Sequence, residues 1–113
     1  MPEKAKLIIG VMHNNKIDLD KILLALNKKY GKIERKSKIF EFDFTDYYKK
    51  EMGQNLKKFF ISFEKLISVD KLPNVKIFKG KLERQFSNKE RRNVNLDPGY
   101  LTSAKLVVAS LKK

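Results

Sequence analysis

The hydrophobic pattern of this chain changes its period repeatedly, and this constrains the fold more than any other feature of the sequence. An apolar run over Lys6–His13 predicts a buried strand, because it is short and partly β-branched. The next apolar residues recur with the spacing of one helical face, between Asp18 as N-cap and Gly31 as C-terminal stop. They are Leu19, Ile22, Leu23, Leu26 and Tyr30. The chain therefore begins with a strand and an amphipathic helix.

The middle of the chain predicts two further strands. Residues 38–45 alternate between phenylalanine and polar side chains, which is typical of a half-buried strand with an acidic outer face. Residues 56–64 alternate in the same way, with Phe59, Ile61 and Phe63 on the core side. The stretch between these strands, from Asp46 to Gly53, predicts a polar turn or a short helix.

A second helix and a fourth strand are expected in the last third of the chain. Pro73 favours the first helical position, and Val75, Phe78, Leu82 and Phe86 form the apolar stripe that follows. Residues 92–96 predict a short strand that ends at the turn residues Asp97-Pro98-Gly99. A final helix is expected over Ser103–Leu111, although Val107-Val108 would also tolerate a strand.

The order strand-helix-strand-strand-helix-strand predicts an α+β fold of the ferredoxin-like type, with an additional C-terminal helix. In that arrangement two helices cover one face of an antiparallel four-stranded sheet. The 113 residues contain no internal repeat and no long linker, so we expect a single domain over residues 1–113.

The expected topology brings several polar side chains to one edge of the domain. The ends of the first and second strands and the start of the fourth strand meet there, which joins His13 to the aspartates and to a pair of arginines. Asn95, Asp97 and Tyr100 follow on or just after the fourth strand, where they could hold a ligand. The candidate ligand-binding residues are therefore Asp43, Asp46, Arg91, Arg92, Asn95, Asp97 and Tyr100.

The net charge is strongly positive and unevenly distributed. The chain has 26 Lys and Arg against 13 Asp and Glu, a formal charge of +13. Residues 28–38 carry six basic side chains against one acidic, and residues 76–92 carry seven against two. Such a surface attracts polyanions, because their binding releases counterions. A lysine-rich surface that maintains solubility is the alternative interpretation.

Three stretches of the sequence are similar to one known family. They are Phe42–Tyr48 with Glu51-Met52-Gly53, Ser62-Phe63-Glu64, and Arg92–Thr102 with Asn-Leu-Asp-Pro-Gly-Tyr-Leu-Thr at its centre. Together they resemble the prokaryotic family catalogued as domain of unknown function 4416, from about Lys6 to the end of the chain. The resemblance implies a homologous unit and no particular reaction. Some members are labelled GTP-binding proteins, but this chain has no G-x-x-x-x-G-K-[ST] motif.

Several chemistries are excluded or disfavoured by composition. Without cysteine there is no thiol nucleophile and no thiolate zinc site, and a single histidine makes a histidine-based metal site improbable. No stretch predicts a signal peptide, and none is long and apolar enough to span a membrane, so we expect a cytoplasmic protein without membrane contact. The sequence identifies no cofactor and does not determine the oligomeric state.

Three functions remain open. The first is a binding module for a phosphate-bearing ligand, either a nucleic acid or a nucleotide. The second is a metal-dependent enzyme on phosphate esters, in which Asp43, Asp46 and Glu51 bind Mg²⁺ and the pair Arg91 and Arg92 clamps the phosphate. The third is a small interaction or assembly domain.

One nucleic-acid motif is partly present. Lys57–Phe63 partly resembles the aromatic third strand of RNA-recognition domains. Only Phe60 of its aromatic residues is expected to face outward, and Glu41, Asp43 and Glu64 are expected to make that face acidic, which opposes RNA binding.

Overall fold

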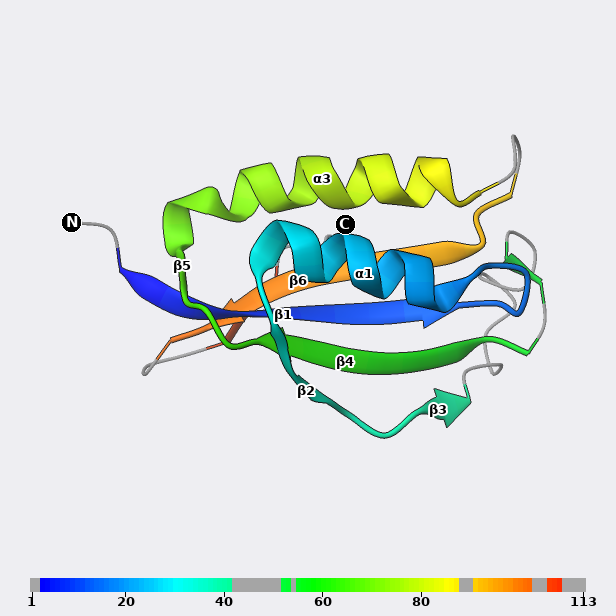
Figure 1. Ribbon diagram of the computed structural model, residues 1–113, viewed down its shortest axis with the longest axis horizontal. Coiled ribbons are helices and arrows are strands. Elements are labelled where there is room, and N and C mark those ends of the chain that lie inside the picture. The colour runs from blue at the N-terminus through cyan, green and yellow to red at the C-terminus, as the bar shows by residue number, and fades with distance from the viewer. Residues whose placement is uncertain (1–2, 42–51, 54, 88–90, 103–105, 109–113) are drawn as a thin grey trace.

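The computed structural model describes residues 3–41, 52–53, 55–87, 91–102 and 106–108 (Figure 1). They form an α+β structure with a mostly antiparallel sheet and two α-helices. The elements in chain order are β1 (Lys4–His13), α1 (Leu19–Tyr30), β2 (Ile33–Lys36), β3 (Phe40–Glu41), β4 (Lys57–Phe63), β5 (Ile67–Ser68), the 3₁₀ turn η1 (Val69–Lys71), α3 (Leu72–Gln85), β6 (Val94–Leu101) and β7 (Leu106–Val108).

Within the described residues the sheet has seven strands, in the order β2-β4-β1-β6-β7, with β3 paired to β4 and β5 paired to β1. All of these pairings are antiparallel. Figure 1 shows α1 and α3 on the same side of the sheet. We call the face of the sheet that points away from the helices the open face.

The core lies between the helices and the inner face of the sheet. Every second residue of β1 and β4 points into it, and the side chains of Ile9, Val11, Phe59 and Phe63 are fully buried. Ile22 and Leu26 of α1 pack against them, as do Val75 and Leu82 of α3. The alternation in the strands and the helical stripes therefore meet in one apolar cluster, as predicted.

Both helices begin and end near the predicted residues. Gly31 follows α1 with φ of 96°, a conformation that favours glycine, and its N–H bonds to the Asn27 carbonyl. Pro73 lies in the first turn of α3, where its missing N–H removes no helical bond.

The second strand differs from the prediction over residues 38–45. The structure instead has β2 at Ile33–Lys36 and a short β3 at Phe40–Glu41, while residues 42–51 lie outside the described residues. β2 is an exposed edge strand that, within the described part of the chain, pairs with β4 alone. Because pairing with one neighbour holds it, its sequence carries no hydrophobic alternation by which it could be predicted. Phe40, expected on an apolar face, is 46% exposed.

The fourth strand does not end at Asp97-Pro98-Gly99, which was predicted to be a turn. β6 runs through these residues to Leu101, and Pro98 pairs with Ile9. The Leu96 N–H points away from β1, toward a carboxylate of α3. Pro98 lies two residues further along, so it also faces away from β1, and its missing N–H removes no bond to β1.

The predicted C-terminal helix over Ser103–Leu111 is also wrong for the part that the structure describes. Leu106–Val108 form β7, which pairs with Gly99–Leu101 of β6. The two β-branched residues Val107 and Val108 favour a strand, and the free edge of β6 offers the hydrogen-bonding partners.

The two adjacent phenylalanines of β4 provide a test of the register. Phe59→Ala removes a fully buried ring and is expected to lower the free energy of unfolding by about 3–5 kcal/mol. Phe60→Ala removes a ring that is 42% exposed and should cost less than about 1 kcal/mol. Urea denaturation of both variants measures the difference, and equal losses would contradict the register.

Candidate functional site

The predicted polar edge was expected to join the end of the first strand, the start of the fourth strand and the aspartates of the second. The structure describes the first two of these three parts. His13 pairs with Val94, and the Asn14 N–H bonds to the Asn93 carbonyl at 3.0 Å, so the end of β1 lies beside the start of β6. Asp43 and Asp46 lie outside the described residues. Their expected proximity to the arginines therefore stays a prediction.

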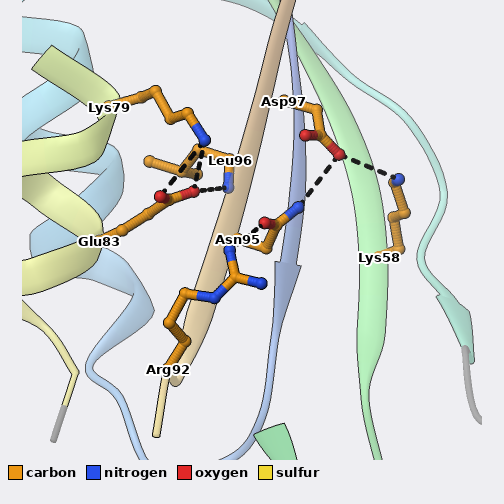
Figure 2. A network of polar contacts seen from close by, with 7 residues as sticks. All are labelled: Lys58, Lys79, Glu83, Arg92, Asn95, Leu96 and Asp97. Atoms are coloured by element: carbon orange, nitrogen blue, oxygen red, sulfur yellow. Dashed lines mark hydrogen bonds and ion pairs between the residues drawn. The ribbon is translucent and has the colours of Figure 1, made fainter. Parts of the chain in front are cut away.

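Four side chains form a continuous polar network on β6 and β4 (Figure 2). Arg92 Nη1 donates to Asn95 Oδ1 at 2.5 Å, and Asn95 Nδ2 donates to Asp97 Oδ2 at 3.1 Å. Lys58 Nζ lies 3.7 Å from the same Asp97 oxygen. Asn95 is almost fully buried, and its amide finds its hydrogen-bond partners in Arg92 and Asp97. The network joins two strands that are separated by β1.

Gly10 lies beneath this crossing. It lies on β1 between Asp97 of β6 and Phe60 of β4. A Cβ at this position would lie 3.1 Å from Cε1 of Phe60 and 3.4 Å from Cε of Lys58. The missing side chain therefore lets an edge of the Phe60 ring approach the backbone of β1 closely, beside the Lys58 stem that reaches over β1 to Asp97.

The remaining predicted residues are not gathered at this network. Tyr100 pairs with Leu7, whose side chain is in the core, so Tyr100 lies on the helix side of the sheet. Asn95 and Asp97 lie on the opposite side of the same strand. Arg91 is exposed beside the start of β6. The structure therefore brings Arg92, Asn95 and Asp97 together, but separates Tyr100 from them.

A buried carboxylate on the helix side was not identified from the sequence. Glu83 of α3 is 7% exposed, and its Oε2 accepts the Leu96 N–H at 2.7 Å (Figure 2). Lys79, one turn earlier, lies 3.1 Å from this oxygen. Glu83 thus satisfies a backbone donor on the outer edge of β6. A lysine and a glutamate four residues apart on a helix are typical of a pair on its solvent-exposed face, so the spacing alone does not indicate a buried carboxylate.

A hollow of about 500 Å³ lies where β2 and β4 meet β1. It is lined by Ile8, Arg35, Lys36, Ser37, Phe60, Ile61 and Ser62, and we call it the β2 hollow. Arg35 is exposed, and the described residues provide no hydrogen-bond or salt-bridge partner for its guanidinium. The Lys36 ammonium lies 4.8 Å from the centroid of the Phe59 ring, at the edge of the core. The hollow therefore combines an unpaired cation with an exposed aromatic ring.

A second hollow of about 340 Å³ lies at the C-terminal end of α1. Lys28, Lys29 and Lys65 line it together with Tyr30. The Tyr30 ring makes edge-to-face contacts with Phe63 and Phe78, each at 5.7 Å between centroids. Burial raises the pKa of Tyr30 to about 12, so its hydroxyl stays protonated at neutral pH.

No metal cluster and no membrane span are found in the part of the chain that the structure describes. Its histidine and acidic residues nowhere form a group of three or more that could hold a metal ion. Asp43, Asp46 and Glu51, which bind Mg²⁺ in the alternative enzyme hypothesis, lie outside it. Neither described helix is long and apolar enough to cross a membrane.

These features define an α+β domain with two helices on one face of its sheet and a basic hollow beside the edge strand β2. The chain belongs to the family described as Domain of unknown function (DUF4416), whose family model matches residues 3–113. The family resemblance expected from the sequence is thereby confirmed. Comparisons with curated proteins and with solved structures give no significant match. The family assignment names no reaction, so function must be argued from the described surface.

Removal of the Glu83 carboxylate tests its role at the edge of β6. Glu83→Ala leaves the Leu96 N–H without an acceptor and is expected to lower the free energy of unfolding by about 1–3 kcal/mol. Glu83→Gln keeps an acceptor oxygen and should lose less. Lys79→Ala removes only the ion pair and should cost about 0–1 kcal/mol. Chemical denaturation compares the three, and a Lys79→Ala loss as large as that of Glu83→Ala would contradict this role.

The raised pKa of Tyr30 makes stability depend on pH in alkaline solution. Unfolded Tyr30 releases its proton near pH 10.0, whereas the folded protein retains it until about pH 12. The folded state therefore binds more protons in this interval, and its stability should fall as the pH rises from about 10 to about 12. In Tyr30→Phe this fall should be smaller when urea denaturation is followed at each pH. An unchanged pH dependence would contradict the assignment.

Proposed function

We propose that this domain binds a phosphate-bearing ligand, a nucleic acid or a nucleotide, at the sheet edge formed by β2. The observation that carries the proposal is the exposed guanidinium of Arg35 in the β2 hollow, which has no acidic partner among the described residues. Arginine presents a planar set of N–H donors that matches phosphate oxygens. An unpaired arginine in a hollow is therefore suited to an anionic ligand.

The charge around this edge supports the same conclusion. The basic stretch over residues 28–38 extends from the end of α1 through β2 and borders both hollows. Its single acidic residue, Glu34, is already paired with Lys6 at 2.8 Å. Since salt bridges among the described residues neutralise little of this segment, its positive potential remains available to attract a polyanion.

We also propose that the fold is of the ferredoxin-like type and that the domain works in the cytoplasm. The order β2-β4-β1-β6 supports the first point. It places β2 and β6 on opposite sides of the inner pair β4 and β1, as the ferredoxin-like order requires of its second and fourth strands. In this interpretation β7 extends the sheet beyond β6, and β3 and β5 are short additions. The cytoplasmic location accords with the proposed ligand, since nucleic acids and nucleotides occur there.

The salt dependence of binding tests the proposed function. Fluorescence anisotropy with labelled oligothymidylate should show that affinity falls as salt rises from about 50 mM to about 200 mM, because counterions are released on binding. Arg35→Ala should weaken binding and reduce the slope of log K against log salt by about 0.7, the contribution of one phosphate contact on a single strand.

Arg84→Ala is the matched control for Arg35→Ala. Arg84 is an exposed arginine of α3, so its removal changes the net charge by the same amount at a position outside the β2 hollow. We expect a smaller change in affinity and slope for this variant. No binding in low salt, or equal effects of the two substitutions, would reject the proposed site.

A further inference from the structure

We propose that the ligand is a single-stranded nucleic acid, one unpaired base of which stacks on the ring of Phe60 while Arg35 contacts a neighbouring phosphate. This inference rests on the proposed function and specifies its ligand. It assigns the open face of the sheet, beside β2, as the surface that distinguishes a nucleic-acid strand from other polyanions.

The first argument is the exposure of aromatic rings on the open face. Phe60 is 42% exposed, and an edge of its ring lies over Gly10, where no side chain separates the ring from the sheet. Phe40 is 46% exposed and pairs with Lys58, which places it on the same face. These are the exposed phenylalanines among the described residues. Rings that protrude from a sheet provide stacking surfaces for unpaired bases.

The second argument is the charge of this face, which the sequence had predicted to be acidic. Glu41 pairs with Lys57, so it lies on the side of the sheet opposite Phe60. Glu64 is exposed after the last residue of β4, four residues along the chain from Phe60, and Glu34 of β2 is paired with Lys6. Asp97, which does lie on the open face, is held by Lys58. The acidic residues that are described therefore do not oppose a polyanion at Phe60.

The third argument is the arrangement of cations around the ring. Lys58 Nζ lies 5.5 Å from the centroid of Phe60, and Arg35 lines the same hollow as that ring. Cations beside an aromatic ring suit a nucleotide, because its base is planar and its phosphate is anionic. Because Lys58 is paired with Asp97, Arg35 is the cation placed to contact the phosphate, while the ring contacts the base.

The length of the basic edge favours a strand over a single nucleotide or a duplex. Basic residues recur from Lys28 to Lys38, which is more positive surface than one phosphate group can occupy. In a duplex the bases are stacked and paired, so they cannot reach Phe60 without being extruded. A flexible single strand can follow the β2 edge and present a base to the ring.

Substitution of Phe60 in the full chain tests this inference by fluorescence anisotropy with oligothymidylate. Phe60→Ala should weaken binding about fivefold or more, the range expected for a lost base stack. Phe60→Trp should retain or increase affinity, since a larger ring is kept. Ile77→Ala is the matched control, because Ile77 is 63% exposed on α3, outside the β2 hollow, and this variant should bind as the wild type does.

Competing polyanions separate this inference from the proposed function. Inorganic tripolyphosphate, a DNA duplex and poly-glutamate should compete weakly with the oligonucleotide, and their binding should not respond to Phe60→Ala. Salt-sensitive binding that needs Arg35 but is unchanged in Phe60→Ala would overturn the stacking inference and leave the proposed function standing. Stronger binding of poly-glutamate than of the oligonucleotide would overturn the inference in favour of an acidic protein partner. Absence of all polyanion binding would overturn both.

Discussion

The burial of alternate side chains of β1 and β4 beneath two helices is the constraint on which the rest of the structure depends. Phe59, Ile61 and Phe63 fill the core, so Lys58, Phe60 and Ser62 must point away from it. A slip of one residue would exchange these two sets and place a lysine and a serine in the core. The composition of the open face therefore follows from the packing on the other side of the sheet.

Gly10 shapes the open face in a second way. It is the residue of β1 over which Phe60 and Lys58 both lie, and a Cβ there would lie only 3.1 Å from Cε1 of Phe60, so the ring would have to shift. The exposed Phe60 ring and the Lys58 stem therefore lie side by side over Gly10. The contact between Lys58 of β4 and Asp97 of β6 passes over the smallest residue of the intervening strand β1.

The sequence predicted the elements whose side chains enter the core, because buried apolar residues recur with the period of the helix or strand that carries them. It predicted the outward position of Phe60 for the same reason. It failed for β2, for β7 and for the end of β6, where pairing with a neighbouring strand decides the conformation. Pro98 illustrates the difference: its local chemistry indicates a turn, yet it lies in a strand at a position where no bond to β1 requires its N–H.

The candidate site shows the same division. The basic stretch over residues 28–38 was evident from the sequence, but the hollow beside Phe60, and the lack of a partner for Arg35 among the described residues, were not. The Asn95–Asp97 pair followed from alternation, whereas the buried Glu83 beneath Leu96 did not, since a carboxylate in a helix predicts a solvated side chain.

By itself, then, the sequence determined which faces are apolar and where positive charge is concentrated, because periodicity and composition are local properties. Only the tertiary structure decided which of those charges are neutralised, which rings stay exposed and which strands meet, because these depend on distances between residues far apart in the chain.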